Sequence, residues 1–383
     1  MFRKAGLLLV TVLLSLTFLG VNTYQNSLQL TTQPKSLIAD HIYHDPIWIT
    51  GDAEFQAVAN IEGWDGSGTI SDPIVISGYL FDNSTIQPIR IWDTTLHFII
   101  SDCVVNGSPS MCGIYLKGTS NGKVLTTEVY ERHSGIIISD CENITVQLCN
   151  LYNNSAHAIE VDSTSMNVTI RENTMSDLGG CGIFGSNSNG ISIVDNEIMN
   201  STKNGIQLSM CNDVEVARSE ISESGLDAVN ITGGQRIDIN NCAMKNNGDN
   251  GVALKSVKNG QVFKNLISSN SAYGVTLTES SENITVSWNT FIQNDGSSQC
   301  NDDGMNNEFI LNFFSNWIAP DANGDGIVDN PYPIDGDAEN QDPYPRRSPE
   351  AEPSIPSGGQ NPLLIGLGVI TLFVIIVVIL KRR

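Results

Sequence analysis

A pair of residues, one small and one aliphatic, recurs along the middle of the chain at nearly constant spacing. The pairs lie 23 or 24 residues apart, at Gly135-Ile136, Ala158-Ile159, Gly182-Ile183, Gly205-Ile206, Ala228-Val229, Gly251-Val252 and Gly274-Val275. A second aliphatic alternation follows in each unit, for example Ile144-x-Val146 and Val168-x-Ile170. Because alternation at every second position is typical of β-strands, each unit is predicted to contain two short strands.

A third repeated position carries a polar or small residue just beyond the second alternation. Its members are Cys149, Asn173, Asn196, Ser219, Cys242, Asn265 and Asn289. If each unit is one coil, equivalent residues stack about 4.8 Å apart, so the Asn amides can hydrogen-bond along the axis. We therefore predict an all-β, right-handed parallel β-helix (solenoid) of about 10–11 coils. The several Leu per unit of a leucine-rich repeat and the 3.6-residue period of helical repeats are both missing from the sequence.

The flanking segments are predicted to cap and anchor this array. A solenoid needs a cap at each end, because its terminal coils would otherwise expose their apolar edges. The predicted organisation is a signal peptide (1–24), an N-terminal cap (37–72), β-helix repeats (73–314), a C-terminal cap with an Asp-rich loop (315–345), a Pro/Ser/Gly linker (346–361), a transmembrane helix (362–380) and a basic tail (381–383).

The two ends of the chain predict export and anchoring. Arg3 and Lys4 precede an apolar run, which is the order of a secretory signal; an uncleaved anchor is the alternative. Leu363–Leu380 is uncharged and is followed by three cations, as in a membrane span with a cytoplasmic tail. We thus expect a cell-membrane protein, single-pass, with an extracellular ectodomain.

Charge and cysteine content limit the possible partners. The formal net charge is −22, with 42 acidic against 20 basic residues, which disfavours nucleic acid because phosphate binding needs clustered Lys and Arg. The cysteines share coil registers too far apart for a disulfide framework, and only Cys103 with Cys112 stays open as a pair. Eight sequons predict a glycoprotein; they lie at Asn83, Asn106, Asn143, Asn153, Asn167, Asn200, Asn230 and Asn283.

Two terminal blocks and the repeat resemble the NosD-like right-handed β-helix family, in particular its surface-anchored archaeal members. The blocks are HDPIWITGDAEFQAVANIEGWDGSGTISDPIVISGY (44–79) and DANGDGIVDNPYPIDGDAENQDPYP (321–345). The resemblance implies a cell-surface β-helix that binds carbohydrate or envelope partners. It does not extend to copper delivery, because copper sites use clustered Met, Cys or His, and here Met175 and Met244 fall on core register.

The second of these blocks begins with a motif that is typical of a hard-cation loop. Oxygen-bearing side chains alternate around a glycine, with the candidate calcium ligands Asp321, Asn323, Asp325, Ile327 (through its carbonyl) and Asp329. Tyr332 stands where an EF-hand has its bidentate Glu, so another acid must complete the shell. The candidates are Asp335, Asp337, Glu339 and Asp342. A structural calcium ion is the first interpretation and an acidic turn without metal is the second.

One grouping on the predicted outer face suits acid–base chemistry. Glu160 and Asp162 alternate on one strand, and His157 precedes them, with Arg132 and His133 one coil earlier. These are weak catalytic candidates, because alternating carboxylates on a strand also arise on a solvated surface. The outward positions are otherwise rich in Ser, Thr, Asn and Gln, and Trp64 and Trp92 are expected to pack in the N-terminal cap.

These features give two functional hypotheses. The first is a membrane-anchored surface scaffold without catalysis that binds a polysaccharide or a cell-envelope glycoprotein. The alternative is a polysaccharide lyase, hydrolase or uronate epimerase that works on the β-helix face. Catalysis requires acids that converge in a groove, whereas a scaffold tolerates scattered acids and a polar surface.

Overall fold

The structure of the protein is a computed structural model, which describes residues 41–349 except for 85, 279, 296–297 and 318–319. The predicted signal peptide, most of the linker and the predicted transmembrane segment lie outside these residues. Within the described part of the chain, no helix has the length and apolar character needed to cross a bilayer.

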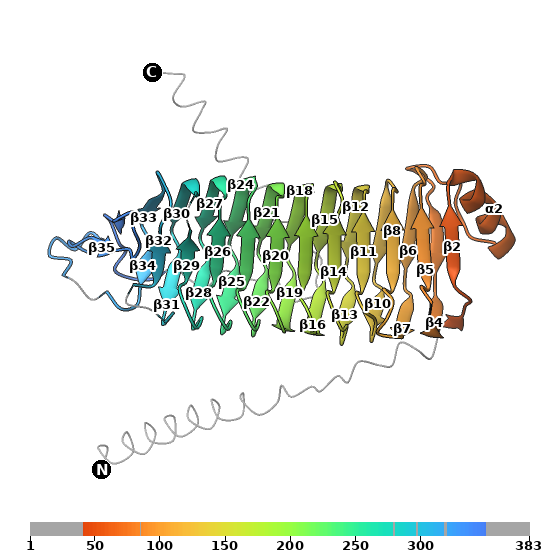
Figure 1. Cartoon of the computed structure of the whole chain (residues 1–383), viewed down its shortest axis with the longest axis horizontal. Coiled ribbons are helices and arrows are strands. Elements are labelled where there is room, and N and C mark those ends of the chain that lie inside the picture. Colours follow the sequence, from red (N-terminus) through yellow and green to blue (C-terminus); the bar gives the residue numbers. More distant parts are fainter. Residues whose placement is uncertain (1–40, 85, 279, 296–297, 318–319, 350–383) are drawn as a thin grey trace, which may run out of the picture. The chain divides into compact units, whose positions relative to one another are not determined.

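The chain coils through three parallel sheets, with one strand in each sheet per coil (Figure 1). Sheet A contains twelve strands. They are β1 (Ile42–Tyr43), β4 (Tyr79–Ser84), β7 (Val104–Gly107), β10 (Glu128–Tyr130), β13 (Asn150–Tyr152), β16 (Thr174–Leu178), β19 (Glu197–Ser201), β22 (Glu220–Ser222), β25 (Ala243–Lys245), β28 (Leu266–Ser268), β31 (Thr290–Ile292) and β34 (Phe313–Phe314).

Sheets B and C contain eleven strands each. Sheet B consists of β2 (Ile47–Thr50), β5 (Ile89–Trp92), β8 (Ile114–Lys117), β11 (Ile136–Ser139), β14 (Ile159–Asp162), β17 (Ile183–Ser186), β20 (Ile206–Ser209), β23 (Val229–Thr232), β26 (Val252–Lys255), β29 (Val275–Leu277) and β32 (Cys300–Asp302). Sheet C consists of β3 (Ile74–Ser77), β6 (Phe98–Ser101), β9 (Gly122–Leu125), β12 (Glu142–Gln147), β15 (Met166–Arg171), β18 (Asn189–Val194), β21 (Asn212–Ala217), β24 (Gln235–Asn240), β27 (Lys258–Phe263), β30 (Glu282–Ser287) and β33 (Glu308–Ile310). The predicted parallel β-solenoid is thus confirmed.

A continuous apolar core runs inside the coils. In β14, Ile159 and Val161 are fully buried, whereas Glu160 and Asp162 on the alternate positions face outward. Each buried Ile or Val stabilises the fold by roughly 1.5–3 kcal/mol. The small residue before each sheet B strand faces tight packing, because a Cβ on Gly135 would lie 2.5 Å from the carbonyl oxygen of Ala158. This close approach explains the small–aliphatic pair in the sequence.

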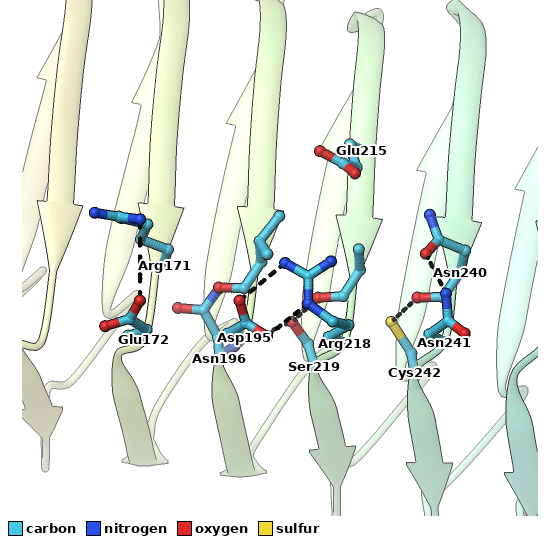
Figure 2. Close-up of polar contacts among 12 residues, drawn as sticks. Arg171, Glu172, Asp195, Asn196, Glu215, Arg218, Ser219, Asn240, Asn241 and Cys242 are labelled. Atoms are coloured by element: carbon cyan, nitrogen blue, oxygen red, sulfur yellow. Dashed lines mark hydrogen bonds and ion pairs between the residues drawn. The ribbon is translucent and has the colours of Figure 1, made fainter. Parts of the chain in front are cut away.

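The predicted polar ladder lies at the inner corner between sheets C and A. Asn173 Nδ2 donates to Asn196 Oδ1 over 3.0 Å, and the backbone N–H of Asn173 donates to the same oxygen at 3.1 Å. The residue before each ladder position turns the corner with positive φ, for example 57° at Asp195 and 48° at Arg218. Figure 2 shows these two residues on the outside of the corner, where Arg218 Nε donates to Asp195 Oδ1 at 2.8 Å.

Distinct elements cover the first and last coils. Helix α2 (Asp52–Glu62) buries Phe55 and Ala59 in the core, and the Phe55 ring lies 5.5 Å from that of Phe98. At the other end, the ring of Tyr332 stacks 3.6 Å from that of Phe314. Tyr332 belongs to a short antiparallel hairpin of β35 (Tyr332–Pro333) and β36 (Gln341–Asp342).

The structure corrects three details of the sequence prediction. Each coil contains three strands rather than two, because the third strand, such as β13, is too short to show alternation. The coils also begin before Pro73, since β1 and β2 already pair with β4 and β5. Finally, the C-terminal cap extends past residue 345 into the predicted linker, where the Arg346 side chain is buried and its Nε donates to the Leu311 carbonyl.

Candidate functional site

The outer face of sheet B presents two parallel rows of side chains. Strand register places Trp48, Arg90, Tyr115, Ile137, Glu160, Phe184, Gln207, Asn230, Ala253, Thr276 and Asn301 in the first row. The second row contains Thr50, Trp92, Lys117, Ser139, Asp162, Ser186, Ser209, Thr232 and Lys255. On β14, these rows confirm the outward positions of Glu160 and Asp162 that the sequence predicted.

Glu160 and Asp162 lie together on β14, as predicted, and their surroundings perturb Glu160. Burial raises the pKa of Glu160 above its ordinary value, and the neighbouring Asp162 raises it further, against the opposing effects of His133 and the Ser134 hydroxyl. A carboxyl with a raised pKa can exchange a proton closer to neutral pH, which general acid–base chemistry requires.

His157 precedes β14 in the chain and is held neutral. Its Nδ1 accepts a hydrogen bond from the backbone N–H of Cys181 at 3.0 Å, and its ring stacks on Phe184 with centroids 4.8 Å apart. Burial, followed by Lys203 and His133, lowers the pKa of His157 to about 4. Because Nδ1 is an acceptor, the ring proton of the neutral form sits on Nε2.

Arg132 does not join this group as the sequence suggested. Its side chain is fully buried, with Nη1 donating to the Asn106 carbonyl and Nη2 to the carbonyls of Ile86 and Cys112. The guanidinium therefore ties neighbouring turns together rather than serving the outer face.

Three strands away from β14, the same face carries a cluster that the sequence analysis missed. We call Trp48, Arg90, Trp92, Tyr115 and Lys117 the aromatic–cation patch. The Arg90 guanidinium carbon lies 4.6 Å from the Trp48 ring centroid and 4.3 Å from the Trp92 centroid. Lys117 Nζ lies 5.5 Å from the Trp92 centroid, and Tyr115 meets Trp92 edge-on. Strands β2, β5 and β8 hold the patch, next to α2 in Figure 1.

Several polar atoms on this face are buried without a hydrogen-bond partner. They are Arg90 Nε, Trp92 Nε1 and Asp162 Oδ1. An unsatisfied buried polar atom costs about 1–3 kcal/mol, and because these atoms are buried, a bound molecule could pair with them only if the side chains around them moved. All three lie on the outward side of β5 and β14.

Trp92 is therefore not part of the N-terminal cap, contrary to the sequence prediction, whereas Trp64 packs there against Phe55 and Tyr79. The alternation Ile89-x-Ile91 could have revealed the outward direction of Arg90 and Trp92. It was missed because Pro88 stands where the later pairs have Gly or Ala, and because Ile89 lies 25 residues before Ile114 rather than 23 or 24.

The predicted calcium loop forms a turn held by its own backbone. Asp321 Oδ1 accepts the N–H groups of Gly324 and Asp325, and Oδ2 accepts that of Gly326. Asp325 Oδ1 accepts the N–H of Ile327, and Asp329 Oδ2 accepts that of Ala322. Arg347 Nη1 lies 3.6 Å from Asp321 Oδ2. Asn323 Nδ2 donates a hydrogen bond to Asp325 Oδ2. Calcium binding here stays a prediction.

One acid considered for the calcium shell has another role. Asp342 is fully buried, and its carboxylate accepts the N–H groups of Leu311 and Asn312 at 3.1 and 2.8 Å. This carboxylate caps the inner ladder, which makes Asp342 unsuitable as a ligand of the exposed loop. Within the described ranges, no group of three or more His, Cys, Asp or Glu residues is arranged to hold a metal ion.

The cysteines of the described segment are all buried and unpaired, Cys103 and Cys112 included. Burial raises the pKa of both of these thiols to about 11. The prediction that the cysteines are packing residues rather than a disulfide framework is confirmed.

Solved structures with similar folds include enzymes that act on polysaccharides. The A-module of Azotobacter vinelandii mannuronan C-5 epimerase AlgE4 matches with a TM-score of 0.51 at 13% identity, covering 67% of this chain and 90% of that module. Pectate lyase Pel9A gives 0.47 at 12%, covering 68% and 79%. The periplasmic alginate epimerase AlgG gives 0.47 at 14%, covering 71% and 85%. At these identities, the likeness concerns the fold alone.

Sequence comparison gives a family rather than a single relative. No curated protein matches the chain in sequence. A family model described as periplasmic copper-binding protein (NosD) matches residues 71–338, from the turn before β3 to the C-terminal cap. Since this match spans most of the chain, the protein belongs to the NosD family.

Proposed function

We propose that this protein is an exported polysaccharide-binding scaffold whose binding surface is the outer face of sheet B. The observation that carries the proposal is the grouping, on one sheet face, of partly exposed aromatic rings with the cationic side chains of Arg90 and Lys117. Trp48 exposes 45% of its surface, and its Nε1 donates to the Gln87 carbonyl, which fixes the indole at the edge of the face.

The geometry of the solenoid suits a linear polymer. Successive coils repeat the face about every 4.8 Å, which is comparable to the length of one sugar unit in an extended chain. Beyond β17, the face continues with hydroxyl and amide side chains, namely Gln207, Ser209, Asn230 and Thr232. Such groups pair readily with sugar hydroxyls, while aromatic rings cover the apolar faces of sugars.

Export to the cell surface is part of the same proposal. It rests on the apolar segments at the two ends of the sequence and agrees with the periplasmic description of the family. A copper role is not proposed, because the described residues do not fit a copper site. Their thiols are buried, and their exposed methionines Met111, Met166, Met210 and Met305 lie on different coils.

Catalysis on a polysaccharide is the second candidate function. It is favoured by the raised pKa of Glu160 beside Asp162, with neutral His157 preceding them in the chain. Such a carboxyl can act as a general acid or base on a bound sugar. The scaffold is preferred because the remaining groups of the face are neutral or lie about three coils away.

One experiment tests both candidates. The purified full-length chain is applied to a polysaccharide array with and without calcium, and the same wells are assayed for bond cleavage and epimerisation. Binding without turnover is the expected result. Turnover that Glu160→Gln or Asp162→Asn abolishes would replace the scaffold by an enzyme, and failure to bind any polymer would refute both.

A further inference from the structure

We propose that the aromatic–cation patch is a subsite for a carboxylated sugar, so that the preferred ligand is an acidic polysaccharide. This inference rests on the proposed polysaccharide-binding function and adds the chemical class of the ligand. It is carried by the position of Arg90 between two indole rings at one end of the sheet B face.

The charge of the patch differs in sign from that of the whole protein. The protein carries a net charge of −22, so its surface as a whole repels a polyanion. The patch nevertheless places Arg90 and Lys117 on adjacent strands. No carboxylate shares the outward positions of β2, β5 and β8. Two acids lie at the edge of the patch, Glu54, which accepts the Thr50 N–H, and the exposed Asp93. The two cations have no acid between them and attract an anionic group at short range.

The surroundings of Arg90 determine the shape of the group that it would bind. The two indoles hold the planar guanidinium by contacts of 4.6 and 4.3 Å to its central carbon, which limits its rotation. Its Nε is buried and has no partner inside the protein, so a ligand would meet Arg90 at its two Nη groups. These two groups match the two oxygens of a carboxylate with parallel hydrogen bonds. A carboxylate is planar like the guanidinium, whereas a sulfate is tetrahedral, and this favours the carboxylate.

Aromatic side chains around Arg90 would contact the sugar ring that carries this carboxylate. Trp48, Trp92 and Tyr115 surround Arg90 on β2, β5 and β8, and Trp48 is the most exposed of the three. A sugar whose acid group reached Arg90 would rest its ring against these side chains. Aromatic packing and ion pairing would therefore act on the same sugar unit.

The acidic residues of β14 limit how an acidic polysaccharide can lie along the face. Glu160 and Asp162 lie three strands beyond Arg90, which is roughly 14 Å at one strand spacing per coil. Their charges repel a second carboxylate, so a polyanion fits best where its acid groups meet the patch and a neutral or protonated stretch passes β14. This predicts selectivity for the patch end of the face.

The test uses matched polymers that differ only in the acid group. Binding of the full-length chain is measured to polygalacturonate and to alginate, and to the carboxyl-reduced derivative of each, at low and high salt. We expect the acidic polymers to bind at least about tenfold more tightly than their reduced forms, the scale of one charge-assisted bidentate contact. High salt should shrink this difference.

Variants then locate the contact. Arg90→Gln should lower the affinity for the acidic polymers by about tenfold and leave the reduced polymers unaffected. Arg171→Gln is the matched control, because Arg171 is an exposed arginine on sheet C that donates to Gln147. Lys117→Gln, which changes an exposed side chain, should weaken acidic binding several-fold and keeps the test valid if Arg90→Gln fails to fold.

The outcomes separate the two proposals. Equal binding of acidic and reduced polymers, or an Arg90→Gln variant that binds like Arg171→Gln, would refute the carboxylate subsite and leave polysaccharide binding in place. Preference for dextran sulfate over both uronate polymers would also refute it. No binding to any polymer would refute the proposed function itself.

Discussion

Asp342 closes the inner ladder of the solenoid by binding Asn312 through both its backbone and its side chain. Asp342 Oδ2 accepts the Asn312 N–H at 2.8 Å and its Nδ2 at 3.0 Å. Asn312 in turn accepts from Asn289 on the preceding coil. The carboxylate thus supplies, at the last coil, the acceptor that the next asparagine supplies elsewhere.

Replacement of Asp342 by Ala should destabilise the whole solenoid. It would leave the N–H groups of Leu311 and Asn312 without acceptors in a buried environment, and the Asn312 amide with the Val286 carbonyl alone, at a cost of roughly 2–5 kcal/mol. The free energy of unfolding from denaturant titration measures this loss. Asp337→Ala removes an exposed carboxyl from the same cap and should change stability little. Equal effects of the two variants would contradict the capping role.

The sequence predicted most of the solenoid because its coils are regular. From Ile136 to Val275, one small–aliphatic pair per coil set the register, and the outward positions of Glu160 and Asp162 followed from it. The inner ladder was predicted for the same reason, since one Asn per coil can only be satisfied by the next. The right-handed winding stays a prediction from the usual chirality of parallel crossovers.

The ends of the solenoid could not be predicted in this way. Pro88 replaces the small residue of the repeated pair, so Arg90 and Trp92 did not align with the later coils, and helix α2 interrupts the spacing between β2 and β5. Asp342 comes from an antiparallel hairpin outside the repeat, and no periodicity connects it to Asn312. The burial of Arg132 depends on three carbonyls from two other coils, which are distant in sequence.

Calcium should stabilise the protein through the loop of Asp321, Asn323, Asp325, Ile327 and Asp329. A site with the millimolar to submillimolar affinity of extracellular modules would add about 1.4–2.7 kcal/mol at 10 to 100 times its Kd. Thermal unfolding with added calcium, compared with added chelator, measures the effect. Asp325→Asn should remove the shift.

The matched control for the calcium loop lies at the opposite end of the solenoid. Asp45 is an exposed aspartate there, and Asp45→Asn should retain the full calcium shift. If the wild-type melting temperature does not respond to calcium, or if both variants respond equally, the loop is an acidic turn without a metal.

The pH dependence of stability should reveal the raised pKa of Glu160. Its pKa is raised by burial and by Asp162, so the native state keeps the proton to a higher pH than the unfolded chain does. The native state therefore binds more protons above the ordinary Glu pKa of about 4.3, and the contribution of Glu160 to stability falls as the pH rises through that window. Glu160→Gln removes this penalty.

The Glu160→Gln variant should therefore be more stable relative to the wild type at pH 7 than at pH 4. Urea titrations at both pH values measure the two free energies of unfolding. Glu215→Gln provides the control, because Glu215 is an exposed carboxyl on sheet C and its loss measures the effect of one surface charge. A difference that stays constant, or that shifts toward the wild type as the pH rises, would mean that Asp162 and burial do not hold the proton on Glu160. The acid–base interpretation of this face would then lose its basis.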